Sequence, residues 1–88
     1  MKVHNLKIKP HYFNDVIRGL KTFEVRYNDR DFKKGDFIIL EEFNNNGYYT
    51  GRFITAEIVY ILKDEAYLKK DHVVLGIKLK LDFGAKTQ

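Results

Sequence analysis

The 88-residue sequence contains no cysteine, which excludes disulfide bonds, cysteine nucleophiles and thiolate metal ligands. It contains no serine either, so serine hydrolase and P-loop chemistry lack their usual residue. A single proline excludes a proline-rich linker. No apolar run approaches the length of a membrane span, and the first residues lack the apolar core of a signal peptide. We therefore expect a cytoplasmic protein without a membrane segment.

The apolar and aromatic residues suffice for one folded domain. Hydrophobic residues make up 44% of the chain, and seven phenylalanines and six tyrosines can each bury a large area. We place a single domain at residues 1–83 and a flexible C-terminal tail at residues 84–88. Sixteen Lys and Arg residues against twelve Asp and Glu residues give a net charge of +4. This mildly basic balance indicates either an anionic partner such as nucleic acid or a lysine-rich solvated surface.

One stretch, residues 18–36, combines two glycines with a dense set of charged side chains. Its middle alternates apolar and polar residues, which is typical of a half-buried strand. The apolar face of this strand carries Phe23, Val25 and Tyr27, and the polar face carries Glu24, Arg26 and Asn28.

The other segments predict one helix and four further strands. Apolar residues at helical spacing after Pro10 predict a helix over residues 10–18 that ends at Gly19. Alternation, apolar runs and turn residues predict the four further strands over residues 3–9, 37–43, 48–62 and 72–83, while the strand described above covers residues 22–28. Long twisted strands of this number tend to curl. The predicted fold class is α+β but mostly β: a small mixed β-barrel of about five strands with one helix after the first strand.

The polar face of the central strand is the candidate binding site. Three cations lie close together in the sequence, namely Lys21, Arg26 and Arg30. Such a set suits a nucleotide, because cations take phosphate and an ionised Glu24 accepts hydrogen bonds from a base edge. Tyr48 or Tyr49 could offer a stacking surface. The alternative is a surface salt-bridge ladder of little energetic consequence.

No metal site and no cofactor are predicted. The three histidines, His4, His11 and His72, lack the spacing of metal ligands. His4 shares a strand face with the core residues Leu6 and Ile8. It is either a buried histidine bonded to the backbone or a pocket residue at the end of the strand.

Residues 19–26 read Gly-x-Lys-x-x-Glu-x-Arg, after His4-x-Leu6-Lys7 and a short helix, and before Gly35-Asp36. This order of elements resembles the ASCH domain (activating signal cointegrator homology) of the PUA-like superfamily, over residues 3–80. Residues 28–32 and 49–52 are similar to a small bacterial and phage subgroup of uncharacterised ASCH-related proteins. The resemblance implies a PUA-like β-barrel, RNA binding and a pocket lined by the motif.

RNA or a nucleotide is therefore the expected partner, and the motif supplies Lys21, Glu24 and Arg26 to the pocket. Further residues predicted to contribute to binding are Asn28, Arg30, His4, Tyr49 and Arg52.

A hydrolase is the alternative function. One branch of ASCH-like proteins resembles this chain in size and hydrolyses N4-acetylcytidine with a lysine, a threonine three residues later and a distant glutamate. Lys21 matches the lysine, but Glu24 stands in place of the threonine, and Glu65 is the candidate for the distant glutamate. This alternative is an amidohydrolase-like enzyme acting on a modified nucleoside, with Lys21 and Glu24 as catalytic candidates. A third hypothesis is a protein-interaction domain without a small-molecule site.

Overall fold

The computed structural model describes residues 1–80, which form five strands and one helix. In chain order the elements are β1 (Val3–Ile8), α1 (Pro10–Ile17), β2 (Phe23–Tyr27), β3 (Phe37–Phe43), β4 (Tyr49–Leu62) and β5 (His72–Leu79). The predicted end of the last strand at residue 83 and the predicted tail at residues 84–88 lie outside the described residues.

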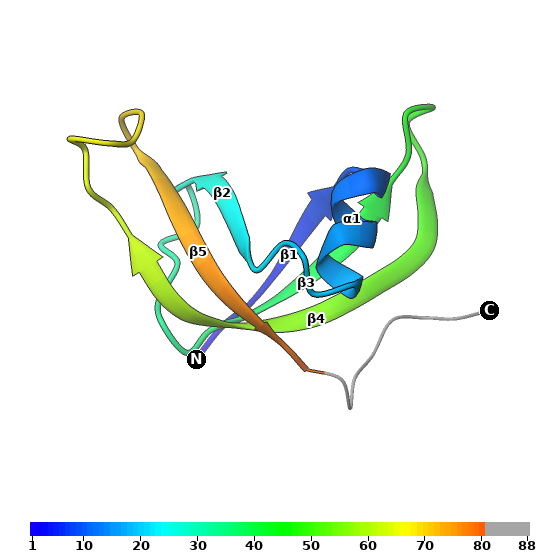
Figure 1. Ribbon diagram of the computed structural model, residues 1–88, viewed down its shortest axis with the longest axis horizontal. Helices are drawn as coiled ribbons and strands as arrows, with labels where there is room; N and C mark the ends of the chain where they lie inside the picture. Colours follow the sequence, from blue (N-terminus) through cyan, green and yellow to red (C-terminus); the bar gives the residue numbers. More distant parts are fainter. Residues whose placement is uncertain (81–88) are drawn as a thin grey trace.

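All five strands form one mixed sheet in the order β1-β3-β4-β5-β2. β1 runs parallel to β3, and the other neighbouring pairs are antiparallel. The long β4 bends along its length, so the sheet curls into a half-barrel with α1 on its concave side (Figure 1). Within residues 1–80, the outer edges of β1 and β2 pair with no further strand. The predicted fold class, a mostly β protein of five strands with one helix after the first, is confirmed.

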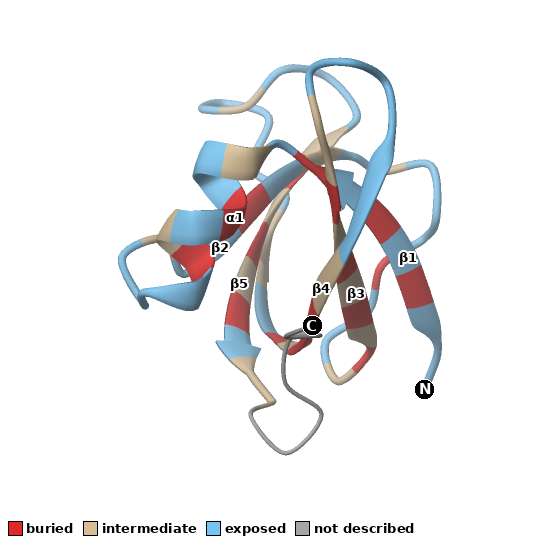
Figure 2. Ribbon diagram, turned by 90° about the vertical axis from the view of Figure 1, so that its right-hand side faces the viewer, coloured by how far each residue is buried: buried red, intermediate tan, exposed pale blue. Residues whose placement is uncertain are grey.

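The core follows the alternation that the sequence predicts for most strands. Figure 2 shows buried and exposed bands alternating along β1, where His4, Leu6 and Ile8 face inward. The buried apolar residues are Leu6, Ile8, Phe13, Val16, Phe32, Ile38, Leu40, Ile54, Ala56, Ile58, Val73, Leu75 and Ile77. Each large aliphatic or aromatic side chain among them contributes about 1.5–3 kcal/mol by leaving water.

Helix α1 ends in a turn that leads directly into β2. Pro10 occupies the first helical position, where its missing N–H is not needed. Gly19 adopts a φ of 77°, which a residue without Cβ does at little cost. Its N–H donates to the Val16 carbonyl oxygen at 3.0 Å, and the Leu20 N–H donates to that of Asp15 at 2.9 Å. This is the Schellman arrangement, and it reverses the chain just before β2.

In β2 the predicted alternation is present, but the burial is the reverse of that in an ordinary amphipathic strand. The apolar residues point outward and are 44% (Phe23), 52% (Val25) and 55% (Tyr27) exposed. Glu24 opposes the core residue Leu75, and Arg26 opposes the core residue Val73. This register with β5 turns the charged face of β2 into the half-barrel.

The alternation of buried and exposed residues along β4 breaks between Ile54 and Leu62. Its pairing with β5 shifts between Ile58 and Tyr60, which marks a β-bulge. Tyr60 is therefore 64% exposed, and it lies across Gly76, where an added Cβ would come within 3.1 Å of the Tyr60 Cβ. Tyr60, like Phe23 in β2, thus lies on the outer surface.

Candidate functional site

The motif brings a lysine, an arginine and a buried glutamate into contact. Lys21 Nζ donates to Glu24 Oε2 at 2.8 Å and to the Phe23 carbonyl oxygen at 2.7 Å. Arg26 Nη2 lies 3.3 Å from Glu24 Oε1. Glu24 is 5% exposed, and an ionised carboxylate is tolerated at such burial because charges and hydrogen bonds compensate it. The sequence prediction that these three residues form one constellation agrees with this geometry.

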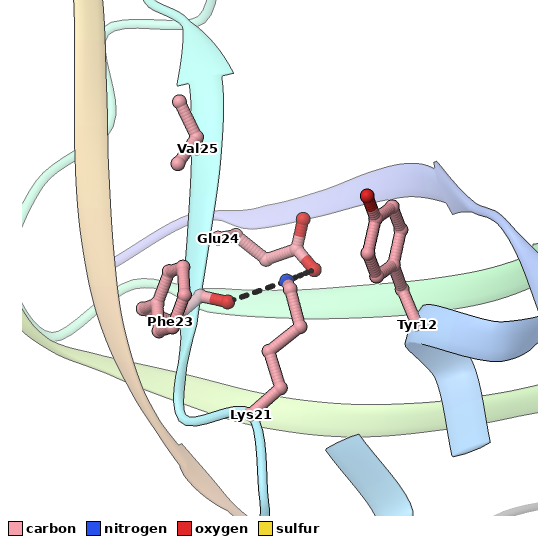
Figure 3. Close-up of a pocket in the computed structure, with 5 residues that line it drawn as sticks. All are labelled: Tyr12, Lys21, Phe23, Glu24 and Val25. Atoms are coloured by element: carbon pink, nitrogen blue, oxygen red, sulfur yellow. Dashed lines mark hydrogen bonds and ion pairs between the residues drawn. The ribbon is translucent and has the colours of Figure 1, made fainter. Parts of the chain in front are cut away.

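A hollow of about 300 Å³ opens beside this group, between β2 and α1 (Figure 3). Its lining consists of Tyr12, Lys21, Phe23, Glu24 and Val25, and we call it the base hollow. Lys21 Nζ lies 5.4 Å from the centroid of the Tyr12 ring and 5.0 Å from that of Phe23. A carboxylate has about four acceptor positions, and the two cations take two of them. The hollow therefore offers aromatic surfaces, a cation and open acceptor positions to a small polar ligand.

Arg26 reaches from β2 to the outer edge of β1. Its Nη2 donates to the Lys7 carbonyl oxygen as well as approaching Glu24. Its Nε is buried and finds no hydrogen-bond partner among the described residues. A buried unsatisfied donor costs about 1–3 kcal/mol.

Arg30, in the loop that follows β2, makes a second bridge to β1, because its Nη1 donates to the Asn5 carbonyl oxygen at 2.8 Å. Arg26 and Arg30 bridge a gap beside β1, and we call this gap the seam. A hollow of about 330 Å³ lies there, and Asn5, Lys7, Arg26, Arg30, Glu41 and Tyr49 are among the residues that line it. The predicted residues Arg30 and Tyr49 thus adjoin Arg26, but they do not line the base hollow.

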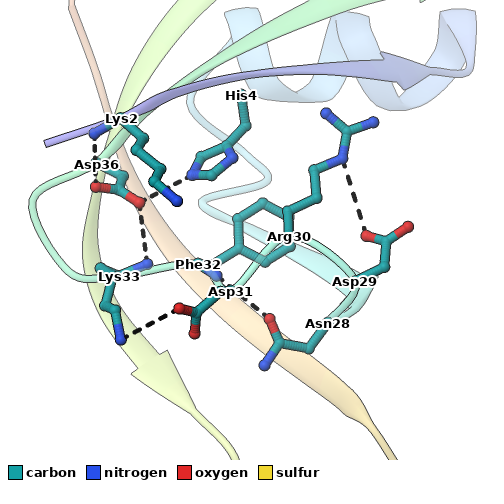
Figure 4. A network of polar contacts seen from close by, with 9 residues as sticks. All are labelled: Lys2, His4, Asn28, Asp29, Arg30, Asp31, Phe32, Lys33 and Asp36. Carbon is teal, nitrogen blue, oxygen red and sulfur yellow. Dashed lines mark hydrogen bonds and ion pairs between the residues drawn. The ribbon is translucent and has the colours of Figure 1, made fainter.

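His4 lies in the core, as the buried alternative predicted, although its partner is a carboxylate and not the backbone. Its Nε2 is 2.8 Å from Asp36 Oδ2, and its ring packs edge-on against Phe32 at 4.8 Å (Figure 4). Asp36 also accepts from the backbone N–H groups of Lys2 and Lys33. Burial raises the pKa of Asp36, but these three hydrogen bonds outweigh it and lower the pKa to about 2. His4 therefore ties β1 to the turn before β3 and lines neither hollow.

Arg52 belongs to a separate group that we call the clasp: Glu42, Thr50 and Arg52. Arg52 Nε and Nη2 donate to the two carboxylate oxygens of Glu42 at 2.9 and 3.0 Å. Its Nη2 also donates to Asn14 Oδ1 on α1 at 3.0 Å. The hydrogen bonds from Arg52 lower the pKa of Glu42 and raise that of Arg52 itself. Arg52 thus joins the β3–β4 hairpin to the helix, away from both hollows.

Asn28 and Glu65 lie at a third place. Asn28 Oδ1 accepts from the Phe32 N–H at 3.3 Å, which shapes the turn after β2. Asn28 and Glu65 line a smaller hollow of about 170 Å³ near the start of β5. The structure therefore does not bring Glu65 to Lys21, as the hydrolase alternative requires.

Among the lining residues that sequence reasoning missed, Tyr12 and Lys7 bear most on binding. Tyr12 precedes the buried Phe13 and lies off the apolar stripe of α1, so the available signal was an aromatic residue on the polar side of a helix beside the motif. Lys7 lines the seam and had no signal beyond its place after His4 and Leu6. Alternation predicts Phe23 for the apolar face of a half-buried strand, but it does not reveal that this residue is exposed and contributes to the lining of the base hollow.

Two kinds of feature are absent from residues 1–80. No group of three or more His, Cys, Asp or Glu side chains is placed to hold a metal ion there. The described part also has no helix with the length and apolar character needed to cross a bilayer.

Fold and site together define a small half-barrel domain in which two cations hold a buried glutamate at the wall of a hollow. The chain belongs to the family described as a domain of unknown function, DUF3850, which matches residues 3–77. It is similar to an uncharacterised 12.9 kDa protein in the GpA 3′ region of Escherichia phage P2, with 36% identity over 74 residues. The matched stretch covers 84% of this chain and 66%, just under two thirds, of that relative. The family match includes the whole motif and the seam.

Proposed function

We propose that the protein is a nucleotide- or RNA-binding module whose base site is the base hollow. The observation that carries the proposal is the buried carboxylate of Glu24, which two cations hold at the wall of a hollow flanked by aromatic rings. The likeness of residues 19–26 to the ASCH motif of the PUA-like superfamily supports the same function.

The chemistry of the hollow suits a nucleobase. A base has a flat face that packs on a ring such as that of Tyr12, while Phe23 contributes to the lining from the outward face of β2. Its edge carries donors next to acceptors, so Glu24 takes an N–H group while the Lys21 ammonium donates to a neighbouring carbonyl or ring nitrogen. Bases with an exocyclic amino group give Glu24 a stronger partner than uracil, which has none.

We do not extend the proposal to hydrolysis. Lys21 Nζ already donates to the Phe23 carbonyl oxygen and to Glu24 Oε2, so its contacts in this structure are those of a hydrogen-bond donor and not of a nucleophile aimed at a substrate. The amidohydrolase activity stays an alternative prediction that the same ligand panel tests.

The test is a titration of the ¹⁵N-labelled protein with cytidine, guanosine, adenosine, uridine and their 5′-monophosphates. We expect amide shift changes at Tyr12 and residues 21–25, with uridine the weakest ligand. Glu24→Gln keeps the size of the side chain but removes its charge, and it should weaken binding at least tenfold. Glu57→Gln is the matched control, because Glu57 pairs with Lys80 away from the hollow.

Equal binding by wild type and Glu24→Gln contradicts the proposal, and so do shift changes confined to another surface. Incubation with N4-acetylcytidine completes the panel, since release of cytidine and acetate would favour the hydrolase instead.

A further inference from the structure

Each guanidinium of the seam donates to a backbone carbonyl oxygen. Arg30 donates to the Asn5 carbonyl oxygen at 2.8 Å, and Arg26 donates to the Lys7 carbonyl oxygen in addition to its contact with Glu24 at 3.3 Å. A carbonyl acceptor fixes the orientation of a guanidinium but leaves its positive charge in place, whereas a carboxylate neutralises it. The carboxylate of Asp29 is loosely placed, 3.8 Å from Arg30 Nε and 60% exposed.

A third cation and an aromatic ring complete the seam hollow. Lys7 Nζ lies 4.4 Å from the centroid of the Phe43 ring and 5.9 Å from that of Tyr49. Tyr49 is 55% exposed, and Phe43 supports its ring edge-on at a centroid distance of 4.9 Å. Glu41 is the one carboxylate residue in the lining of this hollow, so positive charge predominates there.

Arg26 connects the seam hollow to the base hollow. It lies beside Glu24, which lines the base hollow, and it lines the seam hollow itself. Its side chain is 24% exposed, so its guanidinium offers positive charge to a ligand at the junction of the two hollows. A ligand that fills both hollows must therefore carry an anionic group next to a base.

We propose that this ligand is a single-stranded oligonucleotide, an inference that rests on the function proposed above. One base enters the base hollow, the adjoining phosphodiester lies on Arg26, Arg30 and Lys7, and the next base stacks on Tyr49. A single strand fits because its bases are free to leave the stack, and stacking on an exposed tyrosine requires a second base. A mononucleotide places its single base in the base hollow and has no second base to stack on Tyr49.

Fluorescence anisotropy with labelled single-stranded pentamers of mixed sequence, one of RNA and one of DNA, tests the inference. At least one pentamer should bind tenfold or more tightly than a nucleoside 5′-monophosphate. The double substitution Lys7→Gln and Arg30→Gln should remove this advantage and reduce the slope of log affinity against log salt by about 1.4, the value for two lost phosphate contacts. Tyr49→Ala should weaken pentamer binding about tenfold. Lys34→Gln, which removes an exposed charge away from the seam, should behave as wild type.

The nucleoside titration separates the two proposals, because uncharged nucleosides report on the base hollow alone. If nucleosides bind in a Glu24-dependent way but the pentamers bind no more tightly than a monophosphate, the oligonucleotide inference is overturned and the base site stands. If wild type binds neither nucleosides nor pentamers at low salt, both are overturned. Far-UV circular dichroism checks the fold of each variant. Should the double variant unfold, Lys7→Gln alone is expected to reduce the slope by about 0.7, and an unchanged slope contradicts the inference.

Discussion

Glu24 and Glu42 are two glutamates with the same 5% exposure and an arginine neighbour each, yet their surroundings differ. Glu42 accepts from Arg52 at 2.9 and 3.0 Å and from the Thr50 hydroxyl at 2.7 Å. Glu24 accepts one short hydrogen bond, from Lys21, and its arginine neighbour lies at 3.3 Å. Glu42 is satisfied by its own protein, whereas Glu24 keeps acceptor positions beside a hollow.

The difference separates a carboxylate that stabilises the fold from one that is available to a ligand. The clasp around Glu42 also holds the helix, because Arg52 bonds to Asn14 and lies 4.6 Å above the Phe13 ring. Substitutions at the clasp should therefore cost stability and leave the base hollow intact. Substitutions at Glu24 should weaken ligand binding and cost less stability.

Arg52→Ala is expected to have the largest effect on stability. It leaves the buried Glu42 with one remaining hydrogen-bond partner, and removing one member of a buried ion pair costs about 3–5 kcal/mol. Arg52 itself is 40% exposed, so water replaces part of its contribution, and we expect a loss of about 3 kcal/mol. Urea unfolding followed by far-UV circular dichroism measures the loss, and Arg52→Lys should recover part of it. A loss below about 1 kcal/mol would show that the clasp is not structural.

Asp36 is a third buried carboxylate and extends the comparison to pH. Its pKa is lowered from 3.8 to about 2, so its contribution to stability is fully present above pH 3.8 and is lost as the pH falls through about 2. A shift of this size corresponds to about 2 kcal/mol. Wild type should therefore exceed Asp36→Asn by about 2 kcal/mol at pH 7, and the difference should shrink towards zero between pH 4 and pH 2. Urea midpoints of the two proteins measured across this range check the expectation, and a constant difference contradicts it.

The fold was predictable because local signals agreed with the tertiary structure. Alternation in β1 and β5, the apolar run of β3 and the turn residues between strands located every strand, and Gly19 located the end of the helix. The direction in which β2 faces was not predictable. Its register against β5 decides that direction, and no local pattern encodes the register.

The site was predictable where its residues lie close in the sequence. Lys21, Glu24 and Arg26 are brought together by a strand spacing of two and a short approach from the helix. His4 and Arg52 had the right chemistry for a ligand site, but His4 meets a carboxylate 32 residues away and Arg52 meets one on the neighbouring strand. Whether a charged side chain meets a carboxylate of its own protein or a ligand is decided by tertiary packing, which sequence spacing does not report.

Glu24→Gln against Glu42→Gln tests the comparison with one chemical change at two sites. Glutamine keeps an acceptor for Lys21, whose side chain is partly exposed, so we expect Glu24→Gln to lose about 1 kcal/mol. Glu42→Gln places an amide N–H₂ against the Arg52 donors and should lose about twice as much. Thermal and urea unfolding at pH 7 should show the larger loss of stability for Glu42→Gln. The cytidine titration should show the larger loss of affinity for Glu24→Gln. A single order in both measurements would remove the distinction between clasp and site.

The smallest expected effect concerns the outward face of β2. Val25 is 52% exposed, whereas Val73, on the neighbouring β5, is 2% exposed in the core. Threonine has the shape of valine and suits a strand, so Val25→Thr should change stability by less than about 0.5 kcal/mol. Val73→Thr puts a hydroxyl among apolar side chains and should cost about 1–3 kcal/mol. Urea midpoints of the two variants give the comparison directly. If β2 instead buried Phe23, Val25 and Tyr27, as an ordinary amphipathic strand does, both substitutions would cost alike, and Glu24 and Arg26 would face solvent with no hollow to share.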